Sequence, residues 1–219
     1  MLETILSTIR RWRMKTLQPF GSCPAGALRV SLGDTNPAVA QALAAAFRGV
    51  AAVEVVEGSL LDLACDAIVS PANSFGDMGG GIDKAIDDFH GGEAQRRVMA
   101  AIAEHHFGEL PVGSALVVEV PGRRFPFVVA APTMRIPGSV AGSINAYLSM
   151  RATCVAVLKH NATQPTRIRS MAIPGLGTGV GAMPHADASE QMRTAYDQIV
   201  GGTWRDVVHA ALAPYAMRR

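Results

Sequence analysis

The sequence predicts a three-layer α/β/α domain around a central mixed sheet. Apolar strand-like runs alternate with helical patterns along most of the chain. The strand-like runs are continuously apolar, which is typical of strands whose two faces are both covered by helices. The 219 residues are 49% hydrophobic and 17% charged, a composition that excludes disorder for the bulk of the chain. This length fits one domain with short appendages.

The alternating pattern gives each element a place. Strands are predicted at Leu28–Leu32, Val53–Val56, Ala67–Ser70, Ala115–Val120, Phe127–Ala130 and Ile168–Ile173. Helices are predicted at Pro37–Phe47, from about Ile82, and at Glu93–His106, Ser143–Lys159 and Ala186–Val200. The domain therefore spans residues 27–219, including a C-terminal extension, and residues 1–26 form an N-terminal helix and a linker.

The N-terminal segment Met1–Lys15 has apolar residues at helical spacing and basic residues around its far end, which predicts an amphipathic helix. Two interpretations stay open. The helix docks on its own domain or a second subunit, or it anchors the protein to an anionic partner. A Pro/Gly-rich linker, Gln18–Gly26, follows.

Charge, cysteine content and hydropathy restrict the partners and the cellular environment of the protein. A net charge of +2 is too mild to indicate a nucleic-acid partner by itself. The three cysteines are far apart and odd in number, which favours a reducing, cytoplasmic environment. The sequence has no run of 18 apolar residues, so we expect no membrane span. The six histidines have no metal-ligand spacing, and we expect no metal.

Three loops that leave predicted strands carry the residues with the most chemistry. In sheets of this type, ligands bind outside the carboxyl ends of the strands. The first loop is Pro71–Asp83, with three consecutive glycines; the second is Ala131–Arg135; and the third is Gly175–Gly181. Bare backbone amides and a helix N-terminus suit a diphosphate or a ribose edge, although glycines also serve tight turns. No dinucleotide fingerprint, Walker lysine or nucleophile elbow is present.

At these loops the chain resembles the macrodomain family, in particular a mainly microbial branch. The stretch Val55–Asn73 is similar to the family's strand, G-D-I-T and D-A-I-V-N-A-A-N pattern. Gly79–Ile86 matches G-G-G-V-D-x-A-I, and Ile173–Gly181 matches the family's second phosphate loop. The resemblance covers roughly Val53–Val200.

The resemblance implies a cleft for ADP-ribose or an ADP-ribosylated substrate, with nucleic acid only as a modified substrate and no cofactor. It implies two catalytic residues: Asn73, which holds the distal ribose, and Asp83, which activates or orients a water or ribose hydroxyl. The substrate-binding residues would be Ser59, Leu60, Gly79, Gly80, Gly81, Ile82, Gly175, Gly177, Thr178, Gly179 and Val180.

The chain departs from the family pattern at several positions. Ser59 stands where the family usually has an aspartate that accepts from the adenine amino group, so we expect weaker adenine preference. Gly181 replaces an aromatic residue found in many family hydrolases. Alternatives also stay open for single residues. Instead of binding the ligand, Asn73 would fix a turn by bonding its own backbone. Instead of acting in catalysis, Asp83 would cap the N-terminus of a helix or place a negative charge there. Arg135 would either bind phosphate or form a surface ion pair.

Three functions follow from this sequence. One is hydrolysis of a mono-ADP-ribosyl bond or of the terminal phosphate of ADP-ribose. The second is a non-catalytic reader of ADP-ribose or a related nucleotide. The third is a scaffold of the same shape that binds another nucleotide.

Overall fold

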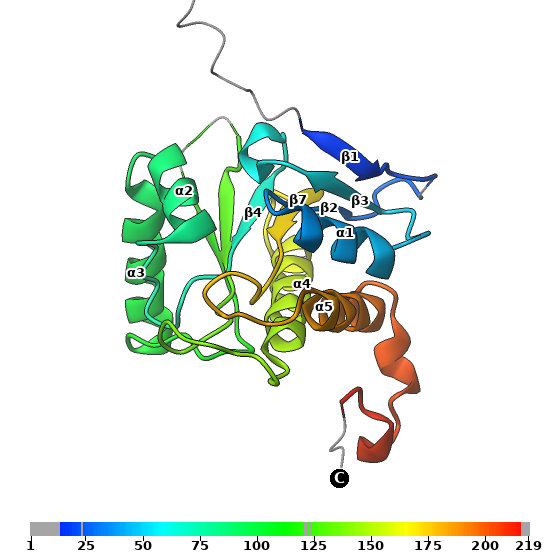
Figure 1. The fold of residues 1–219 in the computed structure, drawn as a ribbon. Coiled ribbons are helices and arrows are strands. Elements are labelled where there is room, and N and C mark those ends of the chain that lie inside the picture. The colour runs from blue at the N-terminus through cyan, green and yellow to red at the C-terminus, as the bar shows by residue number, and fades with distance from the viewer. Residues whose placement is uncertain (1–13, 23, 121, 123, 216–219) are drawn as a thin grey trace, which may run out of the picture.

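The computed structural model describes residues 14–215 except residues 23, 121 and 123, and within them it forms a seven-stranded mixed sheet between two layers of helices (Figure 1). The strands are β1 Lys15–Gln18, β2 Arg29–Asp34, β3 Val53–Glu57, β4 Ala67–Ser70, β5 Leu116–Glu119, β6 Phe127–Ala130 and β7 Ser170–Pro174. The helices are α1 Pro37–Ala46, α2 Gly81–Phe89, α3 Glu93–His106, α4 Asn145–Thr163 and α5 His185–Ile199, with short 3₁₀ turns η1 Leu60–Asp62, η2 Thr203–Asp206 and η3 Ala210–Leu212. The predicted fold class is confirmed.

The sheet has the strand order β1-β3-β2-β7-β4-β6-β5. The inner strands β3, β2, β7, β4 and β6 all run parallel, and the two edge strands β1 and β5 are antiparallel to their neighbours. The exits of the parallel strands therefore lie side by side along one edge of the sheet.

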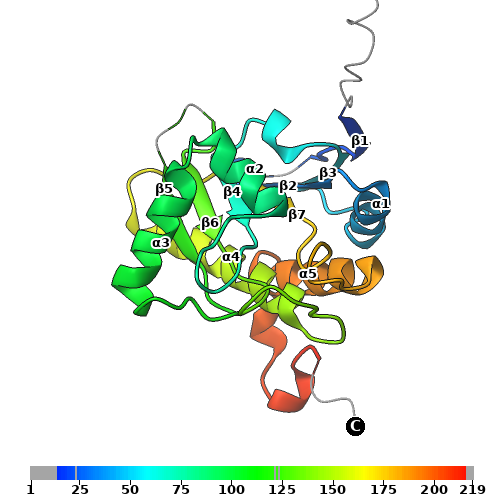
Figure 2. The same cartoon turned by 60° about the vertical axis from the view of Figure 1, so that its left-hand side comes forward.

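Alternation along the strands divides the core into two halves. Val69, Val129 and Ile173 pack with α1, α4 and α5 on one face, whereas Ile68 and Val128 pack with α2 and α3 on the other. Successive strand residues point to opposite faces, so continuous apolar runs such as Ala67–Ser70 supply both cores. Figures 1 and 2 show the helices in these two groups, with η2 and η3 extending below the body.

The N-terminal prediction is wrong where the structure tests it. Lys15, predicted as the end of a helix, begins β1 and pairs with Glu57 of β3; Met1–Arg13 lie outside the described residues. Gln18, predicted to open the linker, ends the strand, and its side-chain amide donates to the carbonyls of Phe47 and Val53 at 3.0 Å each. Pairing with β3 decides the conformation of this short polar segment, because its own sequence has no strand pattern.

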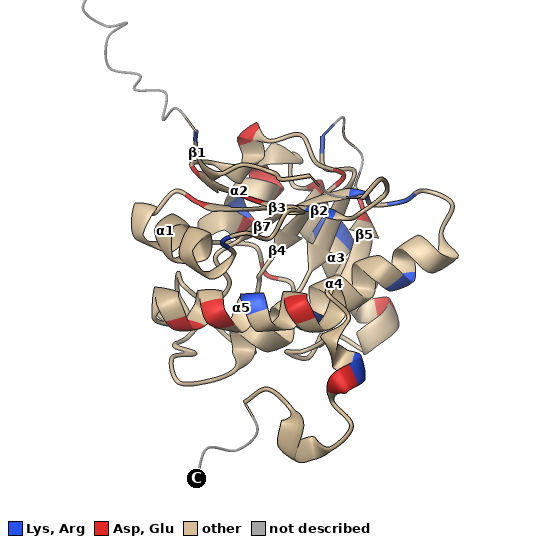
Figure 3. Ribbon diagram, turned by 90° about the vertical axis from the view of Figure 1, so that its right-hand side faces the viewer, with Lys and Arg blue, Asp and Glu red and all other residues tan. Residues whose placement is uncertain are grey.

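The charged residues on α5 are of mixed sign, with Asp187, Glu190, Arg193 and Asp197 spread along it (Figure 3). This helix therefore offers no continuous basic surface to a polyanion.

Candidate functional site

A cleft of about 510 Å³ lies across the exits of the five parallel strands. Its wall comes from the loops after β3, β2, β7, β4 and β6, which are consecutive in the sheet. Neighbouring strands are about 4.8 Å apart, so the cleft spans four intervals, or about 19 Å. Every predicted site residue lines this one cleft, namely Ser59, Leu60, Asn73, Gly79, Gly80, Gly81, Ile82, Asp83, Gly175, Gly177, Thr178, Gly179 and Val180.

The loop after β7 occupies the middle of the cleft. Thr178 Oγ1 donates to the Gly175 carbonyl at 2.9 Å, and the amide of Met183 donates to the Gly177 carbonyl at 3.0 Å. These bonds turn the chain so tightly that Gly177 adopts a φ of +75°, a conformation that favours glycine. Within the described part of the chain, the amides of Gly179 and Val180 donate to no protein acceptor. They are suited to an anion.

The N-terminus of α2 faces the same cleft from the β4 side. Gly80 is its N-cap and forms no side-chain capping bond. The first amides of a helix have no partner inside the helix, and they carry the positive end of its dipole. Together with the β7 loop, this arrangement can hold a diphosphate from two sides.

Gly181 shows why this loop has no aromatic residue at its end. A Cβ at position 181 would lie 2.5 Å from the Gly177 carbonyl oxygen and 2.8 Å from Val140 Cγ2. The amide of Val140 also donates to the Gly181 carbonyl at 2.7 Å. The closest atom belongs to the backbone, which cannot move away cheaply, so the loop conformation requires glycine here.

We expect Gly181→Ala to lower the free energy of unfolding by about 1–3 kcal/mol, because the added methyl overpacks the loop. Gly179→Ala is the matched control, since a Cβ at position 179 meets nothing within 4 Å. Urea denaturation of the two variants measures the difference. Equal stabilities would contradict this account of the loop.

Asp83 lies at the β4 end of the cleft, in the first turn of α2. Ser70 Oγ donates to Asp83 Oδ1 at 2.7 Å, and the amide of Ala72 also faces the carboxylate. Burial raises the pKa of Asp83 and the negative charge of Asp77 adds to this effect, whereas the two donors lower the pKa; the net result is a pKa of about 6. A carboxylate poised near neutral pH at the end of a cleft is suited to accept a proton.

Ser70 is a residue that sequence reasoning missed as a partner of Asp83. It is fully buried at the end of β4, and the only signal in the sequence is a polar side chain at the end of an apolar strand.

Asn73 is largely committed to its own loop. Its Oδ1 accepts from the amides of Phe75 at 3.0 Å and Asp77 at 3.3 Å, and its Nδ2 reaches the Asp77 carbonyl at 3.5 Å. The turn-fixing interpretation of this residue is therefore confirmed. Because an amide nitrogen has two hydrogens, Asn73 can still offer one N–H donor to a molecule in the cleft.

At the other end of the cleft, Ser59 and Asp34 follow neighbouring strands. Ser59 Oγ accepts from the Leu61 amide at 3.3 Å and caps η1. Asp34 ends β2 and lines the cleft, and sequence analysis did not select it. The available signal was an acid directly after a strand, at the edge where the other loops exit.

Arg135 forms an exposed ion pair with Glu109, with N···O distances of 2.7 and 3.0 Å, and stacks over the Phe75 ring. The surface interpretation of Arg135 is the one the structure favours.

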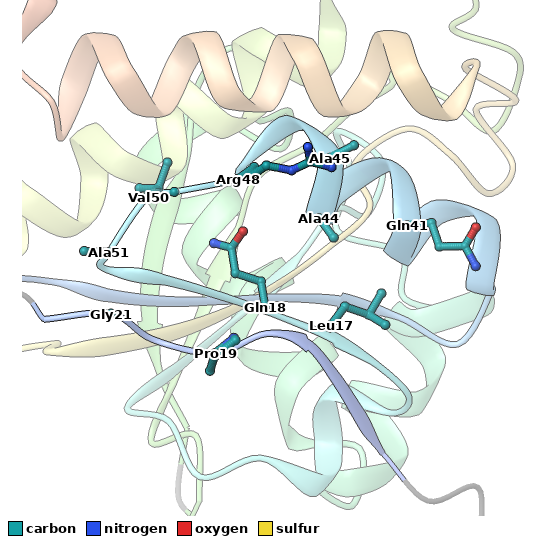
Figure 4. Close-up of a pocket in the computed structure, with 11 residues that line it drawn as sticks. Leu17, Gln18, Pro19, Gly21, Gln41, Ala44, Ala45, Arg48, Val50 and Ala51 are labelled. Atoms are coloured by element: carbon teal, nitrogen blue, oxygen red, sulfur yellow. The ribbon is translucent and has the colours of Figure 1, made fainter.

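A second hollow of about 560 Å³ lies between β1 and α1 (Figure 4). Arg48 is exposed there, and the Gln18 amide is occupied by the backbone bonds given above. The hollow brings together no group of buried polar side chains, so it is a weaker candidate than the cleft.

Over residues 14–215, apart from the three omitted positions, no group of three or more potential ligands could hold a metal ion. Across that same part of the chain, no helix is both long and apolar enough to cross a bilayer.

The fold and the cleft define an α/β/α domain with an elongated cleft, lined by glycine loops, at the carboxyl edge of its sheet. The sequence model of the Macro domain matches residues 69–192. The chain belongs to the macrodomain family.

Relatives and solved structures agree with this assignment. An uncharacterized protein of Aquifex aeolicus is 34% identical over 140 residues, covering 64% of this chain and 78% of that protein. A Macro domain-containing protein of Cupriavidus necator is 30% identical over 142 residues, covering 63% of this chain and 76% of that protein. The Oceanobacillus iheyensis macrodomain solved with ADP superposes with a TM-score of 0.55 at 22% identity, covering 68% of this chain and 76% of that one. The DarG macrodomain of Mycobacterium tuberculosis gives 0.54 at 22% identity, covering 64% and 87%. At these identities the two structures support the fold alone.

Proposed function

We propose that this protein binds ADP-ribose in the cleft and hydrolyses an ADP-ribosyl derivative there, either a mono-ADP-ribosyl bond or a terminal phosphate ester. The observation that carries the proposal is the position of Asp83. A carboxylate with a pKa of about 6 lies at one end of a cleft whose middle is lined by unpaired amides. Family membership and the ADP found in the Oceanobacillus iheyensis macrodomain support the choice of ligand.

The order of the strands suggests how the ligand lies. The diphosphate occupies the middle, between Gly179 of the β7 loop and Gly80 at the start of α2. The distal ribose then reaches the β4 end, where Asn73 offers an N–H donor to a hydroxyl. Asp83 accepts a proton from the attacking water, directly or through a ribose hydroxyl, as the water oxygen bonds to the anomeric carbon or the terminal phosphorus. The bond from that atom to the leaving group breaks, and the leaving group departs with the electron pair and takes a proton from solvent.

Calorimetry with ADP-ribose, AMP and NAD tests the binding half of the proposal. Release of product from ADP-ribosylated protein, ADP-ribosylated nucleic acid and phosphate-terminated ADP-ribose tests the hydrolytic half. Turnover of none of these, with ADP-ribose still bound, would assign the chain to the non-catalytic readers instead. Failure to bind ADP-ribose would leave only a scaffold for another nucleotide.

Gly80→Ala is expected to weaken ADP-ribose binding by about tenfold or more while the protein stays folded. Position 80 has an extended backbone with φ −147°, and a Cβ there meets no protein atom within 4 Å. The methyl group instead projects near the amides that would contact phosphate, where a tenfold loss corresponds to about 1.4 kcal/mol. Calorimetry measures the affinity, and urea denaturation checks the fold.

Gly138→Ala provides the matched control, since Gly138 lies outside the cleft and a Cβ there has only a distant neighbour, the Ile136 carbonyl oxygen at 3.9 Å. Unchanged affinity in Gly80→Ala would mean that phosphate does not approach the α2 N-terminus.

A further inference from the structure

The end of the cleft opposite Asp83 is built by residues that precede the family match. The match begins at Val69, yet β2 lies inside the sheet, between β3 and β7. The loops that leave β2 and β3 supply the wall there, namely Gly33, Asp34, Thr35, Asn36, Gly58, Ser59, Leu60 and Leu61. The identity of the group bound at this end therefore depends in part on Gly33–Asn36, which lie outside the family motifs.

The strand order decides which part of the ligand reaches this wall. If the diphosphate lies over the β7 loop and the distal ribose lies at β4, the remaining direction leads over β2 to β3. These exits are about 5 and 10 Å from β7. The nucleoside must then occupy the end where Asp34 and Ser59 lie.

Asp34 has the geometry of a fixed acceptor. Its Oδ1 accepts from the Asn36 amide at 2.8 Å, and the amides of Gly175 and Thr35 also face the carboxylate. Its backbone carbonyl accepts from the Gly58 amide at 3.0 Å, which joins the β2 exit to the β3 exit. These contacts hold the carboxylate between the β7 loop and the loop that contains Ser59.

The Asp34 carboxylate keeps acceptor capacity for a ligand. A carboxylate has about four lone-pair sites, and the Asn36 amide occupies one of them at 2.8 Å. Burial nevertheless raises the pKa of Asp34, with the amides and His185 acting in the opposite direction. A partly buried carboxylate with unused acceptor positions is stabilised by a further N–H donor.

The other polar side chains of this wall are less suited to the task. Asn36 Oδ1 accepts from the Ala38 amide at 3.0 Å and caps α1. Ser59 Oγ caps η1, and a hydroxyl is neutral, so it discriminates less than a carboxylate.

We infer that Asp34 is the base-selecting residue of the cleft, and that its carboxylate accepts a hydrogen bond from the exocyclic amino group of an adenine. The inference rests on the proposed function, since it assumes that a nucleoside diphosphate lies in the cleft. It replaces the expectation, based on Ser59 alone, that adenine preference is weakened. Ser59 after β3 has no carboxylate, but Asp34 at the end of the neighbouring strand β2 supplies one. The cleft therefore keeps a preference for adenine.

ADP and IDP are the probes that test this role, because they differ at the purine 6-position and lack the distal ribose that would reach Asp83. The 6-amino group of ADP donates, whereas the 6-oxo group of IDP presents an acceptor to the carboxylate. We expect the wild-type protein to bind ADP about tenfold more tightly than IDP. Asp34→Asn should lower that ratio to about one or below, because an amide can donate to the 6-oxo group.

The ratio of the two affinities separates base selection from a structural role. Asp34 also supports Asn36 and Gly175, so its loss can weaken both ligands equally, but equal weakening leaves the ratio unchanged. Asp34→Ser is a second variant, since its hydroxyl can still accept from the Asn36 amide. Asp62→Asn is the control, because Asp62 is an exposed acid of η1 outside the cleft, and its ratio should stay at the wild-type value.

Two results would overturn the inference, and they differ from failure of the proposed function. A wild-type protein that binds ADP and IDP equally, or an Asp34 variant that keeps the wild-type ratio, removes Asp34 from base selection while ADP-ribose binding stands. If the wild-type protein binds neither ADP nor ADP-ribose, the proposed function itself is wrong. Competition calorimetry of the folded variants gives all of these affinities.

Discussion

Asp83→Asn is expected to reduce turnover of the ADP-ribosylated substrate by about 10²–10⁴-fold, the usual cost of losing a positioned general base. Asparagine has the size of aspartate and keeps an oxygen that can accept from Ser70, so most of the ADP-ribose affinity should remain. Single-turnover hydrolysis measures the chemical step, and calorimetry measures the binding. A fall in rate with little change in affinity identifies a group that acts in the transition state.

The pH dependence of kcat/KM gives a second test of Asp83 as the general base. Since the pKa of Asp83 is about 6, its carboxylate is the base form above that pH, and kcat/KM should fall about tenfold per pH unit below it. Ser70 donates to the carboxylate and lowers its pKa. Ser70→Ala should therefore move this acid limb to higher pH while preserving most activity at alkaline pH.

Asp88→Asn is the control for turnover, because Asp88 lies on the same helix but is 64% exposed in an ion pair with Lys84. It should retain wild-type activity. Wild-type turnover in Asp83→Asn, or a flat profile from pH 5 to 8, would exclude Asp83 as the base.

Much of the fold could be predicted because local pattern and tertiary environment agree. Ala67–Ser70, Phe127–Ala130 and Glu93–His106 have the bounds predicted for them, since an apolar run or a helical period occurs between clear breaks. Lys15–Gln18 could not be predicted, because its strand conformation comes from pairing with β3 and not from its own side chains.

The candidate site also has features that the sequence predicts and features that only the folded chain brings together. The glycine loops are recognisable, because backbone approach and tight turns need glycine at fixed spacing. The bond between Ser70 and Asp83 joins residues 13 apart through the fold of an entire loop, and no local pattern encodes it. Asp34 was missed because it belongs to a strand outside the motifs, and only the strand order places β2 beside β7 and β3.

The titration of Asp83 should also make the unfolding free energy of the protein depend on pH. Folding raises the pKa of this carboxyl from its ordinary 3.8 to about 6, so the folded state binds more protons than the unfolded state between these values. Unfolding free energy therefore falls as pH rises through this window. The stabilising effect of the proton is complete below about pH 3.8 and is lost above about pH 6, a difference of about 3 kcal/mol at 1.36 kcal/mol per pKa unit.

Asp83→Asn removes this titration, because an amide stays neutral at every pH. We expect the variant to gain stability relative to the wild-type protein as pH rises from 4 to 7, with the gain approaching about 3 kcal/mol. Urea denaturation at a series of pH values measures it. In Asp88→Asn the same comparison should stay flat within about 0.5 kcal/mol, since an exposed ion pair contributes little.

A variant that is more stable but less active indicates that the charge of Asp83 is held in the cleft for chemistry and at a cost to folding. If the gain did not depend on pH, the buried charge of Asp83 would not be its cause.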